Sequence, residues 1–537
     1  MSGVISDKDL NNEPLAFANV MIKGTTIGTS TDSSGKYSVS AEAGNHILVI
    51  SFIGYETVEV PVTVKANQTI TVNKTIGSGS VKLEDIIVKS TGGNREKETA
   101  LLLDQKNAVE MRQAIGAQEL SRKGVSDAAG AVAKTAGVSE QEGVKNVFVR
   151  GLGDRYNSTS LNGLPLPSED PEYKNISLKF FSTNIIKNIN VNKIFTSNVY
   201  GDVGGANIDI ASSDLEKSQV LSLSIGNGFN SNAIGTNFLV ADGYNYFGIL
   251  KNGSNIPISD LNTYGFDTSY KPTEKNNTTN SNFSIIAGKK FEFANSKSLS
   301  VFGVILSNSD YIFKEGKAGQ VNSQGSTVQD LDFKKYDYSA SQAGLGNIKY
   351  KFGSGKSIVY NVLYIHDSNQ SVADYNGFAR NVNDNSDATN SFIRRQQVNN
   401  NSLFSNQLLF DYKISSQWNT SFGASYNTIN GSEPDRRTNS YDFDQTSNNY
   451  IVGTNTPALN NRFFSKLKED DFAGRFEVTY TLNPDEDLIK KIAVGANYRN
   501  TDRRFDYTQF NFDVQSRVII DINNPDAFFN QASVNAG

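Results

Sequence analysis

The chain offers few side chains that could carry catalytic chemistry. It has no cysteine among its 537 residues, and its two histidines are His46 and His366. A disulfide, a thiolate zinc site and a cysteine nucleophile are therefore excluded, and a histidine-based metal site or catalytic triad is disfavoured. We predict that both histidines are ordinary surface or strand-end residues. We also predict that the protein is not an enzyme and has neither a cofactor nor a metal site.

Three short patterns resemble functional motifs without meeting their requirements. Residues 353–357 end like a phosphate-binding loop, but the first required glycine would fall at Tyr350 and no helix follows. They are predicted to form a hairpin turn. In 151–156, Tyr156 takes the place of the third glycine of a dinucleotide-binding fingerprint. Asp374 and the cluster 383–385 supply oxygen ligands suited to calcium but lack EF-hand spacing, so a solvated loop is the preferred interpretation.

The charge pattern argues against nucleic acid as a partner. The chain has 51 Lys and Arg against 56 Asp and Glu, spread without a basic stripe. No apolar run approaches the roughly 18 residues of a transmembrane helix. The N-terminus lacks the charged and apolar regions of a signal peptide, and the C-terminus stops in polar sequence. We therefore expect a fragment at both ends.

Composition and hydrophobic period divide the chain into four predicted parts. The first has short β-type runs separated by glycines, which favours a small β-sandwich, and the second opens with a flexible Gly-Ser-Gly-Ser linker. The third is mixed, with a helix expected between an N-cap at Ser126 and a C-cap at Gly137, and short strands at 146–150 and 207–211. The fourth contains long strands. The parts are residues 1–76, 77–90, 91–215 and 216–537.

The long strands alternate between apolar and polar residues. In 418–427, for example, Trp418, Phe422 and Tyr426 share one face, opposite Asn419 and Ser425. This pattern fits a soluble sandwich and a transmembrane barrel equally well. Nine strands are predicted, at 219–229, 282–291, 298–308, 344–352, 357–366, 403–414, 418–427, 472–482 and 491–500.

The connections between these strands favour the barrel. Short turns alternate with long polar connections, predicted as loops at 230–281, 309–343, 367–402 and 428–471. Short turns on one rim and long loops on the other are typical of an outer-membrane barrel, and strands near ten residues match its tilted span. Aromatic residues beside the short turns fit an interfacial girdle, namely Tyr350, Phe352, Phe410, Tyr412, Trp418 and Tyr480.

Two segments resemble known domains. Residues 13–20, 23–25, 28–32, 35–37 and 51–55 resemble the carboxypeptidase-regulatory-like domain, a transthyretin-like or Ig-like sandwich without peptidase activity. The middle segment resembles the plug of TonB-dependent outer-membrane receptors. The matching plug-motif residues are Arg150, Gly151, Arg155, Asn162, Gly163, Gly204 and Gly205. The expected fold is therefore mainly β: a sandwich, an α+β plug and about nine strands of a large antiparallel barrel. The family barrel has about 22 strands, which supports truncation.

The resemblance implies a function and partners. Residues Glu84, Asp85, Ile86, Ile87 and Val88 look like the TonB box, which pairs with TonB of the inner-membrane energy-coupling complex. The alternative is that they form the first strand of the plug. The implied function is import of a scarce nutrient across the cell outer membrane by energy-coupled plug movement. Outer-membrane lipid, a small-molecule, chelate or oligomeric ligand, and a surface lipoprotein are the other partners considered. A surface adhesin or structural β-protein is the alternative function.

The resemblance also suggests where a ligand binds. We expect the site among 155–173 of the plug and the three predicted loops after residue 308, with Arg155, Tyr156 and Asn157 as candidate contacts. Arg150 and Arg155 need carboxylate partners if buried, and Glu477 is the candidate on the barrel. By alternation, Phe422, Tyr426, Phe476, Val478, Ile492 and Val494 should face lipid, and Arg475, Glu477, Asn497 and Arg499 should face the lumen or plug.

Overall fold

A computed structural model gives the structure of most of the chain. It describes residues 1–8, 12–25, 27–52, 57–66, 68–77, 101, 105, 112–122, 124–141, 146–250, 261–380, 382, 390–452, 457–483 and 490–536. The chain divides into two compact units, Met1–Thr91 and Gly92–Gly537. The box-like residues 84–88 and the cluster 383–385 lie outside the described residues. Among those described, no helix is long and apolar enough to cross a membrane.

The first unit contains two four-stranded sheets that share one core. Ile5, Tyr37 and Ile76 come from one sheet, and Val20 and Leu48 come from the other. Their alternating burial explains why short β-prone runs suffice to fold this part. The sheets are β1 (Ser2–Asp7), β2 (Glu13–Pro14), β5 (Lys36–Ser38) and β8 (Lys74–Ile76), and then β3 (Asn19–Ile22), β4 (Gly28–Ser30), β6 (Gly44–Ser51) and β7 (Val58–Val64).

The second unit begins with a small α+β region, called the plug segment here and comprising the described residues of 112–212. Its five-stranded sheet mixes parallel and antiparallel pairs. The strands are β9 (Arg112–Gly116), β12 (Ser158–Leu161), β13 (Leu164–Pro165), β14 (Ile186–Asn192) and β15 (Asn207–Ser212), with β10 (Val138–Ser139) and β11 (Phe148–Val149) forming a separate pair.

Short helices complete the plug segment. They are α2 (Ala117–Arg122), α3 (Ala128–Ala133) and the 3-10 turns η1 (Asp154–Tyr156), η2 (Leu178–Phe180) and η3 (Thr183–Ile185). The predicted caps of α3 were wrong. Asp127, not Ser126, is the N-cap and accepts a hydrogen bond of 2.9 Å from the Gly130 amide, and the helix ends at Lys134, before Gly137. A carboxylate accepts this bond as well as a hydroxyl would, so adjacent Ser and Asp left the choice open.

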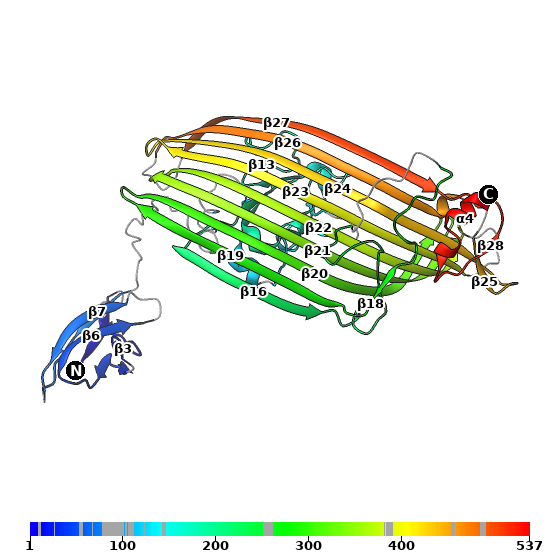
Figure 1. Ribbon diagram of the computed structural model, residues 1–537. Helices are drawn as coiled ribbons and strands as arrows, with labels where there is room; N and C mark the ends of the chain where they lie inside the picture. Colours follow the sequence, from blue (N-terminus) through cyan, green and yellow to red (C-terminus); the bar gives the residue numbers. More distant parts are fainter. Residues whose placement is uncertain are drawn as a thin grey trace. The chain divides into compact units, whose positions relative to one another are not determined.

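Nine long strands lie side by side in one antiparallel sheet, each paired with its neighbours along the chain (Figure 1). The predicted number and order of long strands are confirmed. They are β16 (Gln219–Phe229), β19 (Thr279–Phe293), β20 (Lys297–Val321), β21 (Thr327–Gly353), β22 (Lys356–Ala379), β23 (Ser391–Lys413), β24 (Trp418–Asp444), β26 (Asn461–Thr481) and β27 (Lys491–Asn511).

The loops predicted at 309–343, 367–402 and 428–471 were wrong. These residues mostly continue the strands, and β21 and β24 each reach 27 residues. Of the four predicted loops, the first stays a long connection in its described residues, over 230–278, and it contains the short pair β17 (Phe238–Val240) and β18 (Thr273–Lys275). The remaining elements are β25 (Asn449–Val452), β28 (Val518–Ile519), η4 (Pro457–Leu459), η5 (Pro525–Ala527) and α4 (Gln531–Ala536).

The short turns agree with the prediction. Gly353 and Lys356 pair across the turn that resembled a phosphate-binding loop, and Gly355 takes a positive φ of +68°. The segment is therefore a hairpin, and the phosphate-loop alternative is excluded. His366 was predicted at a strand end but lies within β22, where it is buried and its ring nitrogens lie 2.6 Å from Gln342 Oε1 and 2.7 Å from Asn400 Oδ1. His46, at the start of β6, contacts the Glu42 carbonyl at 2.9 Å.

The large sheet has two distinct faces. On the face called the plug face here, Phe302, Leu345 and Leu363 join the core of the plug segment. The opposite, outer face exposes large apolar side chains such as Tyr350 and Ile358. Period-two alternation separates these two sets, because successive side chains of a strand point to opposite sides. Phe422, Phe476 and Val494 lie on the outer face, whereas Arg475 and Arg499 reach the plug segment.

Candidate functional site

A tight turn places the plug motif against the large sheet. Asn162 and Gly163 join β12 to β13 with positive φ values of 53° and 76°. A side chain at Gly163 would be strained, and its Cβ would lie 2.0 Å from Arg475 Nη1. The Gly163 amide donates to Asp209 Oδ1 at 2.6 Å. The glycine is therefore required both by the turn and by the close approach of the sheet.

Asn157, a candidate ligand contact, is hydrogen-bonded to the backbone of the plug segment. Its buried side chain donates to the carbonyls of Leu152 and Gly153 at 3.2 and 3.1 Å and accepts from the Ala206 amide at 3.0 Å. A Cβ at Gly205 would lie 2.3 Å from Asn157 Oδ1, which explains the glycine there. Asn157 is therefore buried and engaged by the backbone, and its role as a direct ligand contact stays a prediction.

Asn157→Ala is expected to loosen the plug segment. The change leaves the Ala206 amide and at least two carbonyls without their partner, and one unsatisfied buried group costs about 1–3 kcal/mol. Tyr156→Ala is the matched control, because Tyr156 is half exposed and surface changes usually stay within about 0.5 kcal/mol. Hydrogen exchange of plug-segment amides in the intact protein measures the local opening free energy. Equal exchange rates in both variants would contradict this role.

Polar side chains of the sheet hold the turn in place. Gln407 accepts from Asn162 Nδ2 at 2.8 Å and donates to the Leu161 carbonyl at 2.9 Å. Asn427 Nδ2 donates to the Pro165 carbonyl at 3.2 Å, and Arg475 Nη1 reaches the Gly163 carbonyl at 3.4 Å. These contacts are hydrogen bonds, three of them to backbone carbonyls, rather than apolar packing. They fix the position of the turn, and a shift of the plug segment would exchange them for water at small net cost.

An arginine and carboxylate network continues this contact along the sheet. Arg499 Nε contacts the fully buried Asp471 carboxylate at 2.5 Å and Arg503 contacts Glu469 at 3.4 Å. Arg499 also donates to the Leu166 carbonyl at 3.4 Å, and Arg503 donates to the Asp170 carbonyl. Each arginine therefore joins a buried carboxylate of the sheet to the backbone of the plug segment, and the charge of each carboxylate is compensated.

A third contact is ionic and joins β14 to β21. Lys187 Nζ lies 2.5 Å from Asp214 and 3.2 Å from Glu216, and Lys349 lies 3.1 Å from the other Asp214 oxygen. Burial by itself would raise the pKa of Asp214, but the charges of Lys349 and Lys187 outweigh it and hold that pKa below its ordinary value. Asp214 therefore stays ionised and bridges the plug segment and the sheet.

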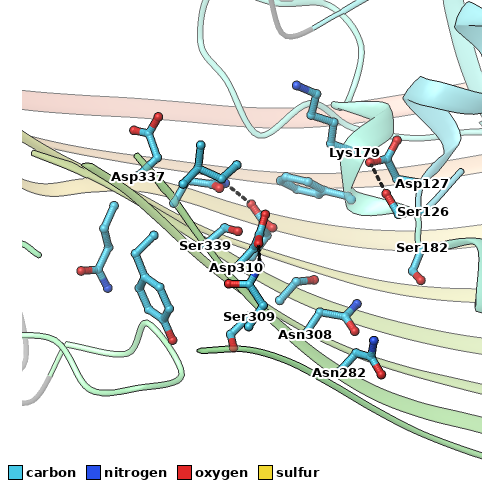
Figure 2. A pocket seen from close by; sticks show the side chains of 18 of the residues that line it. Ser126, Asp127, Lys179, Ser182, Asn282, Asn308, Ser309, Asp310, Asp337 and Ser339 are labelled. Carbon is cyan, nitrogen blue, oxygen red and sulfur yellow. Dashed lines mark hydrogen bonds between the residues drawn. The ribbon is translucent and has the colours of Figure 1, made fainter. Parts of the chain in front are cut away.

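A cavity of about 1260 Å³ lies between the plug segment and the plug face of β16 to β23. Figure 2 shows Ser126, Asp127, Lys179 and Ser182 of the plug segment on one side and strand residues such as Asp310 on the other. Serine and asparagine supply half of the lining, and acidic groups outnumber basic ones. Such walls offer many hydroxyl and amide hydrogen bonds beside some apolar surface.

Strand register arranges the cavity wall in rows of directly opposed residues. One row runs Asn308, Ser341, Asp367 and Asn401, and the next runs Asp310, Ser339, Asn369 and Asn399. Because opposed Cβ atoms lie about 4.5–5.5 Å apart, each row is a continuous strip of hydrogen-bonding groups. A ligand with regularly spaced polar groups could contact several strands at once.

The structure separates the predicted site residues. Among the described residues, the cavity takes Glu169 from 155–173 and many residues from 309–343 and 367–402, but none from 428–471. Arg155 and Tyr156 are exposed and do not line it. The pairing of an arginine with Glu477 was wrong: Arg150 donates to the Lys193 carbonyl at 3.1 Å, and Glu477 accepts from Thr479 at 3.1 Å.

Sequence reasoning missed several of these residues. The cavity residues Ser126, Asp127 and Lys179 come from short helical turns with no recognisable motif. The ion group around Asp214 joins strands that are far apart in the chain. The row Asp310, Ser339 and Asn369 could be predicted only if the pairing register of the strands were known. Among described residues, no group of three or more His, Cys, Asp or Glu could hold a metal.

Comparison with known families explains both N-terminal segments. Residues 1–88 match the CarboxypepD_reg-like domain model. Residues 104–206 match the model of the TonB-dependent receptor plug domain. The chain carries a TonB-dependent receptor plug domain. Both predicted resemblances are thereby confirmed, and the turn, the buried Asn157 and the cavity-lining residues up to Asn184 all belong to this plug domain.

Three proteins show how far the similarity extends. The chain is 42% identical over 86 residues to "TonB-dependent receptor SusC" of Bacteroides thetaiotaomicron, covering 15% of this chain and 8% of that protein. It is 41% identical over 96 residues to "TonB-dependent receptor P39" of Formosa agariphila, covering 16% and 9%. The ferric-catecholate import receptor Fiu of E. coli K12 aligns over 75% of this chain and 67% of that chain, with a TM-score of 0.36 and 9% identity. The aligned stretches thus span a small part of the curated relatives.

Proposed function

We propose that this chain forms the plug and part of the wall of an outer-membrane receptor that imports a polar nutrient. The nutrient binds in the cavity between the plug domain and the large sheet. TonB then pulls on the segment 84–88, and the plug domain shifts and opens a path to the periplasm. In this proposal the chain is a transporter and not an enzyme, and the N-terminal sandwich is an accessory domain. A surface lipoprotein is a further candidate partner.

The observation that carries this proposal is the shared wall of the cavity. Plug residues such as Lys179 and strand residues such as Asp310 face the same space, so a ligand in it would contact both. The plug domain is held beside that space by hydrogen bonds and ion pairs at Gln407, Arg499 and Lys187, and by apolar packing on sheet residues such as Phe302 and Leu345. The polar contacts define one resting position and can be exchanged for water when the plug domain shifts.

The outer face of the sheet supports a membrane location. On the outer face, aromatic residues at the short turns lie beside Lys297 and Lys356, and apolar rows follow from there up to Ile305 and Tyr364. Eight residue steps at about 3.3 Å give ~26 Å along the strands, and a barrel tilt near ~40° reduces this to ~20 Å. This approaches the ~25 Å apolar band of outer-membrane barrels. An adhesin or structural role would leave the cavity beside the plug domain without a purpose.

The lining favours an uncharged ligand that is rich in hydrogen-bonding groups. Opposed hydroxyl and amide side chains such as Ser339, Asn369 and Asn399 can donate and accept at once. The excess of acidic over basic groups in the lining disfavours a strongly anionic ligand. Hydroxyl-rich and amide-rich nutrients both fit this chemistry.

Ser339→Trp is expected to abolish retention of the nutrient. Ser339 lies on the plug face within the cavity, so an indole there fills the space that the ligand would occupy. Gly344→Trp is the matched control, because Gly344 is on the outer face of the same strand and a Cβ at this position would have no neighbour within 4 Å. Outer membranes carrying each receptor are incubated with rich medium, and retained solutes are identified by mass spectrometry. A solute retained equally by both variants would exclude the cavity as the binding site.

A further inference from the structure

A compact loop tip, Asn245–Ile249, lies within the long connection between β16 and β19. It is closed by an antiparallel bridge between Tyr244 and Leu250. Asn245 organises it: its amide donates to the Ile249 carbonyl at 3.0 Å, and its Oδ1 accepts from the amides of Phe247 and Ile249 at 2.9 and 3.0 Å. An Asn side chain used in this way stabilises a tight turn without help from other elements.

The tip is docked on the outer face of the large sheet. Gly248 has a φ of +77°, and a Cβ there would lie 2.2 Å from the Ser368 Cβ, so only glycine fits. The Tyr246 hydroxyl contacts Ser281 and Ser309 at 2.5 and 2.7 Å, and the Tyr338 hydroxyl donates to the Tyr246 carbonyl. These contacts hold the tip in one position, so its outward side chains are presented by a fixed backbone.

Apolar side chains on this fixed tip remain exposed. Phe247 and Ile249 are 47% and 49% exposed, although Leu250 beside them packs against Val398 and Tyr244. Single exposed apolar residues are common on protein surfaces. Here two of them lie close together on a turn whose backbone is fixed by hydrogen bonds, so they form a small apolar surface of defined position. The connection could have kept polar residues at these positions without loss of the turn, because Asn245 makes its hydrogen bonds to their backbone.

The register places the tip just above the apolar rows of the outer face. Ser309 and Ser368, which the tip contacts, lie two rows beyond Ile305 and Tyr364, with the polar row of Gln342 and His366 between. Four residue steps along tilted strands raise the tip by ~10 Å. The hydrocarbon core of a bilayer is ~30 Å thick and the whole bilayer ~40–45 Å, so this level falls at the boundary between acyl chains and headgroups.

We propose that Phe247 and Ile249 form a lipid anchor that inserts into the outer leaflet at this boundary. An aromatic and a branched aliphatic side chain on a rigid turn are suited to that depth, where apolar groups gain burial while the nearby backbone stays hydrated. The anchor fixes the connection 230–278 against the wall of the sheet. The inference rests on the proposed membrane location of the sheet and adds a second, separate lipid contact to it.

Nitroxide labelling of single cysteines tests the anchor, because the chain has no native cysteine. The intact receptor with Phe247→Cys, Phe422→Cys or Leu261→Cys is labelled and reconstituted in liposomes of phosphatidylcholine and phosphatidylglycerol. Collision rates with oxygen, which enriches in lipid, and with a water-soluble nickel chelate are measured. Phe422 lies in the apolar rows, and Leu261, 80% exposed, is the reference position for water.

We expect the ratio of oxygen to nickel collisions at position 247 to exceed that at 261 severalfold and to lie below that at 422. Ile249→Cys should give the same result and serves if the first variant folds poorly. A water-like ratio at both 247 and 249, with a lipid-like ratio at 422, would overturn the anchor and leave the proposed function intact. A water-like ratio at 422 as well would overturn the membrane location itself.

Discussion

Joining Asn162 to Gln407 through a short, reducible bifunctional thiol reagent is expected to stop uptake while the nutrient still binds. In the Asn162→Cys, Gln407→Cys variant the two positions start within hydrogen-bonding reach, 2.8 Å between Nδ2 and Oε1. The cross-link fixes the turn of the plug domain to the sheet, so the proposed shift cannot occur. The cavity is not changed, because neither residue lines it. Uptake and retention of the solute identified with Ser339→Trp are both measured.

A cross-link within the sheet provides the control. Asn347 and Asn361 are also in contact, at 2.6 Å between Nδ2 and Oδ1, but they join β21 to β22 and not the sheet to the plug domain. The Asn347→Cys, Asn361→Cys variant should transport normally when cross-linked. Reduction of the linker should restore uptake in the first variant, since thiol exchange releases the bridge. Full uptake with the Asn162 and Gln407 positions joined would mean that the plug domain need not leave this contact.

Ile87→Pro is expected to reduce uptake to background without loss of nutrient binding. Residues 84–88 are proposed to pair with TonB as an added strand, and proline removes one backbone donor from that pairing and restricts its own φ. Binding depends on the cavity, far along the chain from this segment. Uptake and retention are measured in the same membranes, together with the amount of receptor inserted.

Ser80→Pro is the control for this change. It lies in the Gly-Ser stretch, where no strand pairing is proposed, and should transport normally. If residues 84–88 instead formed the first strand of the plug, Ile87→Pro would speed hydrogen exchange across the plug domain and lower nutrient retention. Normal uptake by Ile87→Pro would exclude both roles.

The apolar half of each long strand could be predicted from the sequence because its two faces have different environments, which produces a clear alternation of residue types. Between Trp418 and Asn427, one face packs on the plug domain and the other is apolar and exposed, so the two sets of side chains differ sharply. Beyond Thr428 the outer face is polar, and the connection 230–278 or the C-terminal residues cover it. Arg437 and Arg462 are fully buried there, with Asp435 2.7 Å from Arg462. Polar residues on both faces look like a loop, which is why the strand extensions were missed.

The plug domain shows the same division on a smaller scale. The motif residues at 150–163 and 204–205 identified the domain, because positive φ at Gly151 and Gly163 and close packing at Gly205 each require glycine and so leave a recognisable spacing. Their partners did not follow from that spacing. An asparagine can hydrogen-bond either to backbone groups or to a ligand. In the structure Asn157 is buried and accepts a hydrogen bond from the Ala206 amide.

Local rules thus determined the strand order, the short turns and the two recognised domains, since each depends on residues that are neighbours in the chain. Gly355 between two strands makes a hairpin whatever surrounds it. Tertiary structure alone decided which polar residues meet. Asp310, Ser339 and Asn369 form one row because β20, β21 and β22 pair in a single register, and a shift of one residue would turn every one of these side chains to the other face. Glu169 reaches that cavity only through the fold of the plug domain. A site assembled from separate strands carries no signal in any one of them, because its specificity lies in the pairing.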